Sequence, residues 1–115
     1  MKKYIFMVIL LAGSMLAANA QKHAPRPYSA SKYVPGIYPE ASKRLLKYSD
    51  VQGLTGWDLK VMRNEIYARH GYIFKTQEMI DYFNGQSWYY PSLRSVENKL
   101  SEVEKKNINF IKNYE

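Results

Sequence analysis

The stretch MRNEIYARHGYIF at residues 62–74 decides the fold of this chain. Placed on a helix at about 100° per residue, Leu59, Met62 and Ile66 fall within about 60° of one another. Apolar side chains on one face are typical of a helix that packs against a core. We therefore expect the centre of the domain to be a helix that ends within this stretch.

Both ends of this helix are marked by residues that favour helix termini. Thr55 is a good N-cap, and Asp58, three residues on, places a carboxylate at the positive end of the helix. Gly71 stands just past the other end, where a left-handed residue commonly terminates a helix. The pattern predicts a helix over residues 56–70.

Polar residues crowd the apolar face near the helix end. Arg69 lies about 20° from Met62 on one side of the apolar stripe, and His70 and Arg63 flank its other side. Glu65 precedes Arg69 by four residues, so an ion pair is available. One interpretation is structural, because cations of the last turn can bond the final carbonyl groups. The other is that Arg63, Tyr67 and His70 form one shoulder that faces a ligand.

The pentapeptide Tyr-Ala-Arg-His-Gly at residues 67–71 resembles the motif after which the YARHG domain family is named. The likeness extends from about Tyr38 to Glu115. The resemblance implies an extracytoplasmic module of bacterial proteins, and it assigns no ligand and no reaction. We place the YARHG-like domain at residues 40–115.

The first twenty residues have the pattern of a signal peptide. Lys2 and Lys3 give a basic start, an apolar run continues to Leu16, and Ala18–Ala20 offers a small-residue cleavage site. The run is shorter than the roughly 20 apolar residues of a membrane span, and it carries no cysteine for a lipid anchor. We expect a soluble exported protein, periplasmic or extracellular after cleavage near Ala20.

Residues 21–39 contain four of the five prolines, with Tyr, Ser, Ala and Lys between them. This composition predicts an extended linker, and a tyrosine-bearing recognition segment is the alternative.

Charge and cysteine content restrict the classes of function. Without the leader the chain has 15 basic and 10 acidic residues, a net charge of +5. Such a charge favours anionic surfaces such as acidic glycans, wall polymers or lipid headgroups, and export argues against nucleic acid. A solvated basic surface is the alternative. Because there is no cysteine, the domain must be stabilised by packing alone, to which its aromatic side chains contribute.

A second helix is predicted after the motif. Thr76 can cap a helix over residues 77–84, in which Met79 and Phe83 form the buried edge. An aromatic loop follows, and residues 93–98 show no period and are expected to be loop.

The last helix begins at a capping box. Ser101 and Glu104 have the spacing of this motif, which predicts a helix over residues 102–114. Asn107 falls in the middle of its apolar arc, where the amide must find partners. We predict that Asn107 faces inward and bonds backbone groups of a loop. Tyr114 is expected on the same apolar face.

The segment before the motif helix should also contribute to the core. Leu45 and Leu46 are expected to dock on it, and Ser49 and Gln52 resemble a capping box that would start one turn over residues 50–53. The predicted fold is all-α: a small irregular three-helix bundle with a short N-terminal helical turn.

The sequence offers little material for catalysis. It has no cysteine and no nucleophile elbow, and His70 is the only histidine of the domain, so we expect no enzyme, no metal and no cofactor. A small hydrolase using Glu65 or His70 is the less favoured alternative.

The expected function is that of a non-catalytic binding module of the cell envelope or exterior, which recognises an anionic glycan or wall polymer. A protein-interaction or structural envelope domain is the alternative. The candidate binding residues are those of the motif helix and of an aromatic loop that would join them if it folds back over the helix: Arg63, Tyr67, Arg69, His70, Trp88 and Tyr89. The alternative is that Trp88 fills the core, because a domain without disulfides needs its largest apolar side chains inside.

Overall fold

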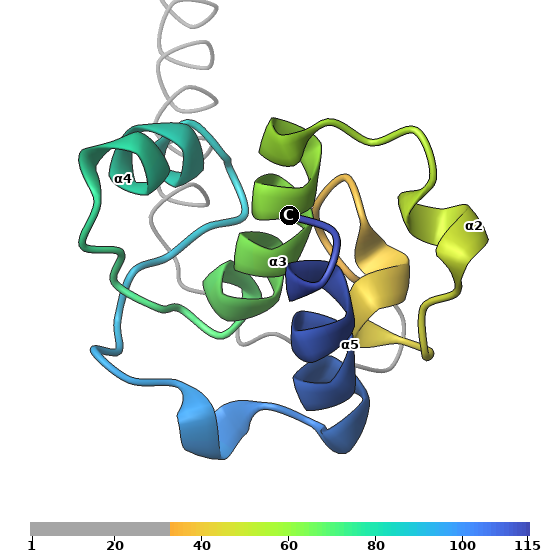
Figure 1. Cartoon of the computed structure of the whole chain (residues 1–115). Helices are drawn as coiled ribbons and strands as arrows, with labels where there is room; N and C mark the ends of the chain where they lie inside the picture. Colours follow the sequence, from red (N-terminus) through yellow and green to blue (C-terminus); the bar gives the residue numbers. More distant parts are fainter. Residues whose placement is uncertain (1–32) are drawn as a thin grey trace, which may run out of the picture.

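The helix around the motif, α3 (Gly56–Arg69), lies in the middle of the domain (Figure 1). The computed structural model describes residues 33–115, so the expected signal peptide and most of the expected linker lie outside the described residues. The other elements are η1 (Pro39–Ser42), α2 (Tyr48–Val51), α4 (Gln77–Asn84), η2 (Glu97–Lys99) and α5 (Glu102–Lys112). Within residues 33–115 the only β pairing is an isolated bridge between Tyr72 and Leu93. The predicted all-α class is confirmed.

Both predicted ends of α3 are confirmed. The Thr55 hydroxyl accepts a hydrogen bond from the Asp58 N–H, and the Asp58 carboxylate accepts one from the Thr55 N–H. At the other end Gly71 adopts φ = 81°. The Tyr72 N–H bonds the Tyr67 carbonyl at 3.2 Å and the Gly71 N–H bonds the Ala68 carbonyl at 3.0 Å, the two bonds of a Schellman ending. The chain therefore turns sharply out of the helix at the pentapeptide.

We expect Gly71→Ala to lower the free energy of unfolding by about 1–3 kcal/mol, because alanine is strained at a positive φ. A Cβ at this position would also clash with the Ser92 hydroxyl oxygen and lie 3.0 Å from the Tyr90 carbonyl oxygen. Urea denaturation followed by circular dichroism measures the change. Gly56→Ala is the matched control, since a Cβ there meets open space at the start of a helix, and it should leave stability unchanged or raise it. Equal effects at the two glycines would contradict the account of this turn.

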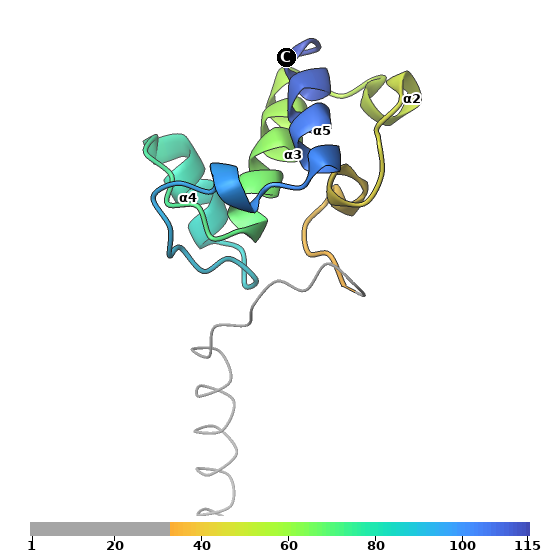
Figure 2. The ribbon, with the colours of Figure 1, turned by 90° about the horizontal axis from the view of Figure 1, so that it is seen from below.

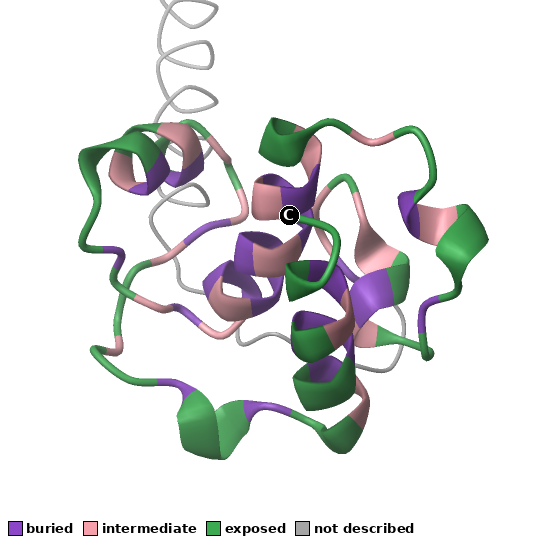
Figure 3. Ribbon diagram, in the orientation of Figure 1, coloured by how far each residue is buried: buried purple, intermediate pink, exposed green. Residues whose placement is uncertain are grey.

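Helices α3 and α5 lie side by side (Figures 1 and 2). They share the larger of two apolar clusters with the segment before α3, and Figure 3 shows buried positions on their facing sides. The buried members are Ala41, Leu46, Val51, Leu59, Met62, Ile66, Leu100, Ile108 and Ile111. The stripe predicted for α3 therefore faces the core as expected.

The second cluster forms around α4, where Met79 and Phe83 are buried as predicted. Rings pack on Phe83 from several directions: Phe74 stacks on it at 4.7 Å between centroids, and Trp88 meets it edge to face at 6.0 Å. Tyr67 packs against both clusters and so connects the two halves of the domain.

Two details of the segment before α3 differ from the expectations. The predicted short helical turn is present as α2, but it begins at Tyr48 instead of residue 50, because the Asp50 carboxylate accepts the Lys47 N–H at 2.7 Å. Leu46 docks on the core, whereas Leu45 is 53% exposed. A leucine pair in a short non-helical segment projects to opposite sides, so only one of the two can be buried.

The segment after α4 returns to the end of α3 and is more ordered than expected. The Ile73 N–H bonds the Leu93 carbonyl at 2.8 Å, and Val96 is buried. Residues 93–98, expected to be loop, include the start of η2, so that expectation is wrong in part. Tyr114, expected on the inner face of the last helix, is 43% exposed and lies beyond the end of α5.

The first residues of the described chain also pack on the domain. Val34 is 6% exposed, and the Ala41 side chain of η1 is fully buried in the main cluster. The packed part of the chain thus includes residues before the predicted domain start at residue 40.

Candidate functional site

The Arg69 guanidinium is fully buried and holds the segment before α2 against α3. Its Nε donates to the Pro35 carbonyl at 2.6 Å, and its two terminal nitrogens donate to the Ser42 hydroxyl at 2.7 Å and the Tyr38 carbonyl at 2.9 Å. It also contacts the Glu65 carboxylate at 3.1 Å, the predicted ion pair, with side-chain exposures of 0% and 1%. A buried guanidinium with this many acceptors is well compensated.

Glu65 binds the same segment from the other side. Its two oxygens accept the N–H groups of Ile37 at 2.7 Å and Tyr38 at 2.9 Å. Burial raises the pKa of the Glu65 carboxyl, while these two N–H groups and the Arg69 charge act to lower it. Glu65 and Arg69 therefore clamp residues 35–42 between them.

His70 continues the network toward α5. Its Nε2 lies 2.9 and 3.1 Å from the two oxygens of Glu104, which is 3% exposed. The Ser42 hydroxyl donates to Glu104 at 2.8 Å and accepts from Arg69. A continuous chain of contacts thus runs through five side chains: Glu65, Arg69, Ser42, Glu104 and His70. We call this chain the motif network.

The motif network favours the structural interpretation of Arg69 and His70, by partners that the sequence did not indicate. The last-turn cations were expected to bond the final carbonyls of their own helix. Instead, Arg69 binds the segment before α2 and His70 binds a carboxylate of α5. Ser42 and Glu104 were not predicted, and only the capping-box spacing marked Glu104 as special. Within residues 33–115 every buried side-chain nitrogen and oxygen has a hydrogen-bond partner.

The Glu104 carboxylate should make the domain sensitive to acid. Burial raises its pKa, but hydrogen bonds from His70, the Ser101 N–H and Ser42 outweigh burial and hold its pKa below the ordinary value near 4.5. A lowered folded-state pKa stabilises the fold above the unfolded-state value, and this contribution is lost as the pH falls through the folded-state pKa. Glu104→Gln should therefore lose less free energy of unfolding between pH 6 and pH 3 than the parent chain, as measured by urea denaturation.

The other carboxylates contribute equally to the pH dependence of stability in the parent chain and in Glu104→Gln. The pKa of Asp50 lies at about 2, because the Arg44 guanidinium and the Lys47 N–H favour its charged form. The raised pKa of Glu65 acts in the opposite direction, since protonation at low pH favours its folded state. Identical acid profiles for Glu104→Gln and the parent would contradict the role assigned to Glu104.

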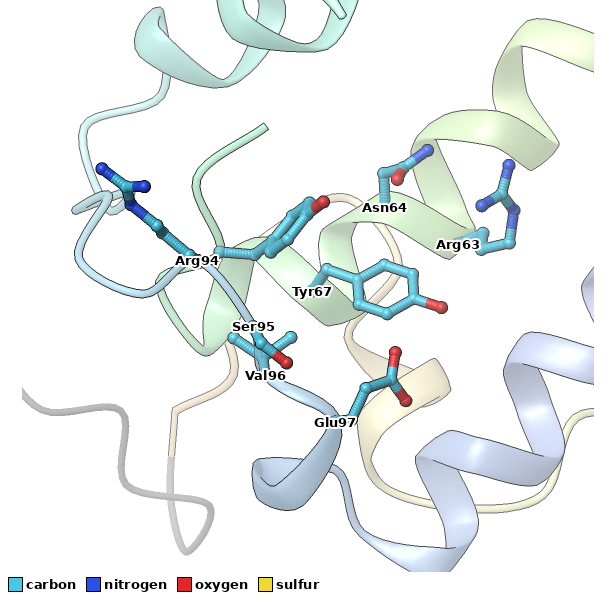
Figure 4. A pocket seen from close by; sticks show the side chains of 8 residues that line it. Arg63, Asn64, Tyr67, Arg94, Ser95, Val96 and Glu97 are labelled. Carbon is cyan, nitrogen blue, oxygen red and sulfur yellow. The ribbon is translucent and has the colours of Figure 1, made fainter. Parts of the chain in front are cut away.

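The predicted shoulder of Arg63, Tyr67 and His70 is divided in the structure. His70 turns to Glu104, whereas Arg63 and Tyr67 line a pocket of about 330 Å³ (Figure 4). The lining combines charged, aromatic and small polar side chains: Arg63, Asn64, Tyr67, Tyr72, Arg94, Ser95, Val96 and Glu97. We call this the tyrosine pocket. A second pocket of about 280 Å³ shares Arg63, Asn64 and Tyr72 with it and reaches Lys60 and Lys75.

The aromatic loop does not line this pocket, and the structure favours the alternative in which its rings pack against the core. Trp88 is half-buried against Phe83, and Tyr89 is 8% exposed, with its hydroxyl donated to the Tyr72 carbonyl. Both rings pack in the second cluster, because a domain without disulfides needs its large apolar side chains inside. Arg94 and Glu97 complete the pocket instead. No sequence signal marked them, since their segment shows no periodicity.

Tyr67 is the centre of the tyrosine pocket. Its ring lies between Arg63 and Glu97 and packs on the Tyr72 ring at 5.9 Å (Figure 4). Burial raises the pKa of the Tyr67 hydroxyl, and the negative charge of Glu97 raises it further, so the hydroxyl stays protonated at neutral pH. The pocket therefore offers an aromatic face, hydroxyl and guanidinium donors, and one carboxylate acceptor.

Residues 33–115 contain neither a candidate metal site nor a candidate membrane span. No group of three or more His, Asp or Glu side chains in this part of the chain is arranged to hold a metal ion. No helix among these residues has the length and apolar character needed to cross a membrane.

Comparison with known proteins gives one finding. Residues 34–115 match the YARHG domain, so the chain belongs to the YARHG domain family. The match begins at the buried Val34 and so covers the segment that the motif network clamps. Searches of curated proteins and of solved structures give no match.

Proposed function

We propose that this protein is a non-catalytic binding module that acts outside the cytoplasm and recognises an anionic glycan or wall polymer of the cell envelope. The observation that carries the proposal is the tyrosine pocket, which combines the Tyr67 and Tyr72 rings with two guanidinium groups. Sugar rings pack on aromatic faces, and planar guanidinium groups bind carboxylates or phosphates. The signal-peptide pattern of residues 1–20 supports export.

The contacts of the titratable motif residues support a non-catalytic role. Glu65 is committed to the N–H groups of Ile37 and Tyr38, and His70 lies against Glu104. An acid–base pair needs both groups within reach of one substrate, whereas these two serve separate internal partners.

Binding can be tested by incubating the tagged chain with purified envelope polysaccharide and, separately, with envelope protein. Arg94→Ala removes an exposed pocket cation and should reduce retention on the polysaccharide. Lys106→Ala is the matched control, because Lys106 is an exposed cation that does not line the tyrosine pocket. Retention on protein alone would favour the alternative, a protein-interaction domain. Equal retention of the two variants on polysaccharide would remove the tyrosine pocket from the proposal.

A further inference from the structure

A carboxylate already occupies the guanidinium at the edge of the tyrosine pocket. The Glu115 side chain reaches Arg63 from beyond the end of α5, 52 residues away in sequence. Its two oxygens meet two nitrogens of the guanidinium, with Nη2 donating to Oε1 at 2.9 Å and Nε donating to Oε2. This two-point contact is the arrangement in which arginine binds carboxylates most strongly.

The pair is well placed for exchange with an outside ligand. The side chains of Arg63 and Glu115 are 23% and 19% exposed, so the contact is shielded but remains open to solvent. By contrast, the Arg69–Glu65 pair is closed to solvent and part of the motif network. Glu115 lies beyond α5, and Asn113, Tyr114 and Glu115 are all exposed as residues, so the Glu115 side chain can leave Arg63 by changing its rotamer without unpacking the core.

We propose that Arg63 is a binding site for the carboxylate of an acidic sugar and that Glu115 occupies it in the absence of ligand. This inference rests on the proposed function and names the ligand class. The ligand carboxylate would replace that of Glu115 on the guanidinium, and the sugar ring would pack on Tyr67.

The other side chains of the pocket favour a sugar over a peptide or a phosphate. Glu97 lies across the Tyr67 ring from Arg63 and repels a second anionic group, yet it accepts hydrogen bonds from hydroxyl groups. A uronic acid carries one carboxylate and several hydroxyls on one ring. It therefore suits a pocket with the Arg63 guanidinium on one side and the Glu97 carboxylate on the other. The Tyr67 and Tyr72 rings supply the apolar surface between them.

The test measures binding of methyl galacturonoside, a uronic acid sugar with one carboxylate, by the full chain with isothermal titration calorimetry. Glu115→Gln removes the competing charge and should tighten binding about fivefold, the factor expected when an exchangeable ion pair no longer occupies the site. Arg63→Gln should abolish binding in both backgrounds. Glu102→Gln is the matched control, since Glu102 is an exposed glutamate of α5 that contacts only Lys105 among the described residues, and it should change nothing.

Three further probes distinguish a wrong ligand class from a wrong binding site. The methyl ester of this sugar should not bind, and a glutamate-containing peptide or inorganic phosphate should not gain affinity in Glu115→Gln. A gain for the peptide or phosphate equal to that for the sugar would overturn the ligand class. Unchanged affinity in both Glu115→Gln and Arg63→Gln would overturn the site. Retention on envelope polysaccharide that survives Arg63→Gln would leave the proposed function standing while refuting this inference.

Discussion

Arg69→Ala should lower the free energy of unfolding by about 3–5 kcal/mol, the cost expected when one partner of a buried ion pair is removed. The change leaves the Glu65 carboxylate buried beside an empty space and removes the donors to Pro35, Tyr38 and Ser42. A domain of this size without disulfides has little stability in reserve. Urea denaturation followed by tryptophan fluorescence should show a midpoint far below that of the parent or no folded baseline.

Two variants keep this prediction open to refutation if Arg69→Ala does not fold. Arg69→Lys preserves the charge but not the planar fork, so it should fold with intermediate stability. Arg94→Ala removes an exposed arginine with no contact to the motif network and should change the free energy by less than about 0.5 kcal/mol. A fully stable Arg69→Ala protein would show that the motif arginine does not support the fold.

Asn107→Leu should destabilise the domain by about 3 kcal/mol. The Asn107 amide donates to the carbonyls of Ala41 and Arg44, both at 2.8 Å, and accepts the Leu46 N–H at 2.9 Å. Leucine has a similar size but leaves three backbone groups without partners, and each buried unsatisfied group costs about 1–3 kcal/mol. Thermal and urea unfolding measure the loss.

Asn109→Leu is the matched control for this substitution. Asn109 lies on the exposed side of the same helix, so the same change there should alter stability by less than about 0.5 kcal/mol. A larger loss at Asn109 than at Asn107 would contradict the assignment of Asn107 as the amide that holds the segment from Ala41 to Leu46.

The helical frame could be predicted because its signals are local. The capping residues Thr55 and Ser101 and the left-handed Gly71 each act within a few residues, so their positions in the sequence indicate where helices begin and end. Asn107 was also predictable, since a polar residue in the middle of an apolar arc must find buried partners. The inward-facing stripe of α3 followed from periodicity alone.

The candidate site could not be predicted as a whole because its parts come from distant segments. The Arg69–Glu65 pair was visible as an i, i+4 spacing, but the contact of His70 with Glu104 spans 34 residues and depends on how α3 and α5 pack. The Arg63–Glu115 contact spans 52 residues and gives no local signal. Two interpretations of the aromatic loop stayed open in the sequence, because composition does not distinguish a ring that fills a core from one that faces a ligand.

The central claim is that the motif helix clamps the segment before α2 through Glu65 and Arg69. Amide hydrogen exchange of Ile37 and Tyr38, followed by NMR, tests it most directly, because both N–H groups donate to the Glu65 carboxylate. Ile37 is 64% exposed as a residue, so its amide has no reason to be protected except this bond. We expect both amides to exchange nearly as slowly as those in the centre of α3. Exchange at the rate of an unstructured peptide would contradict the clamp.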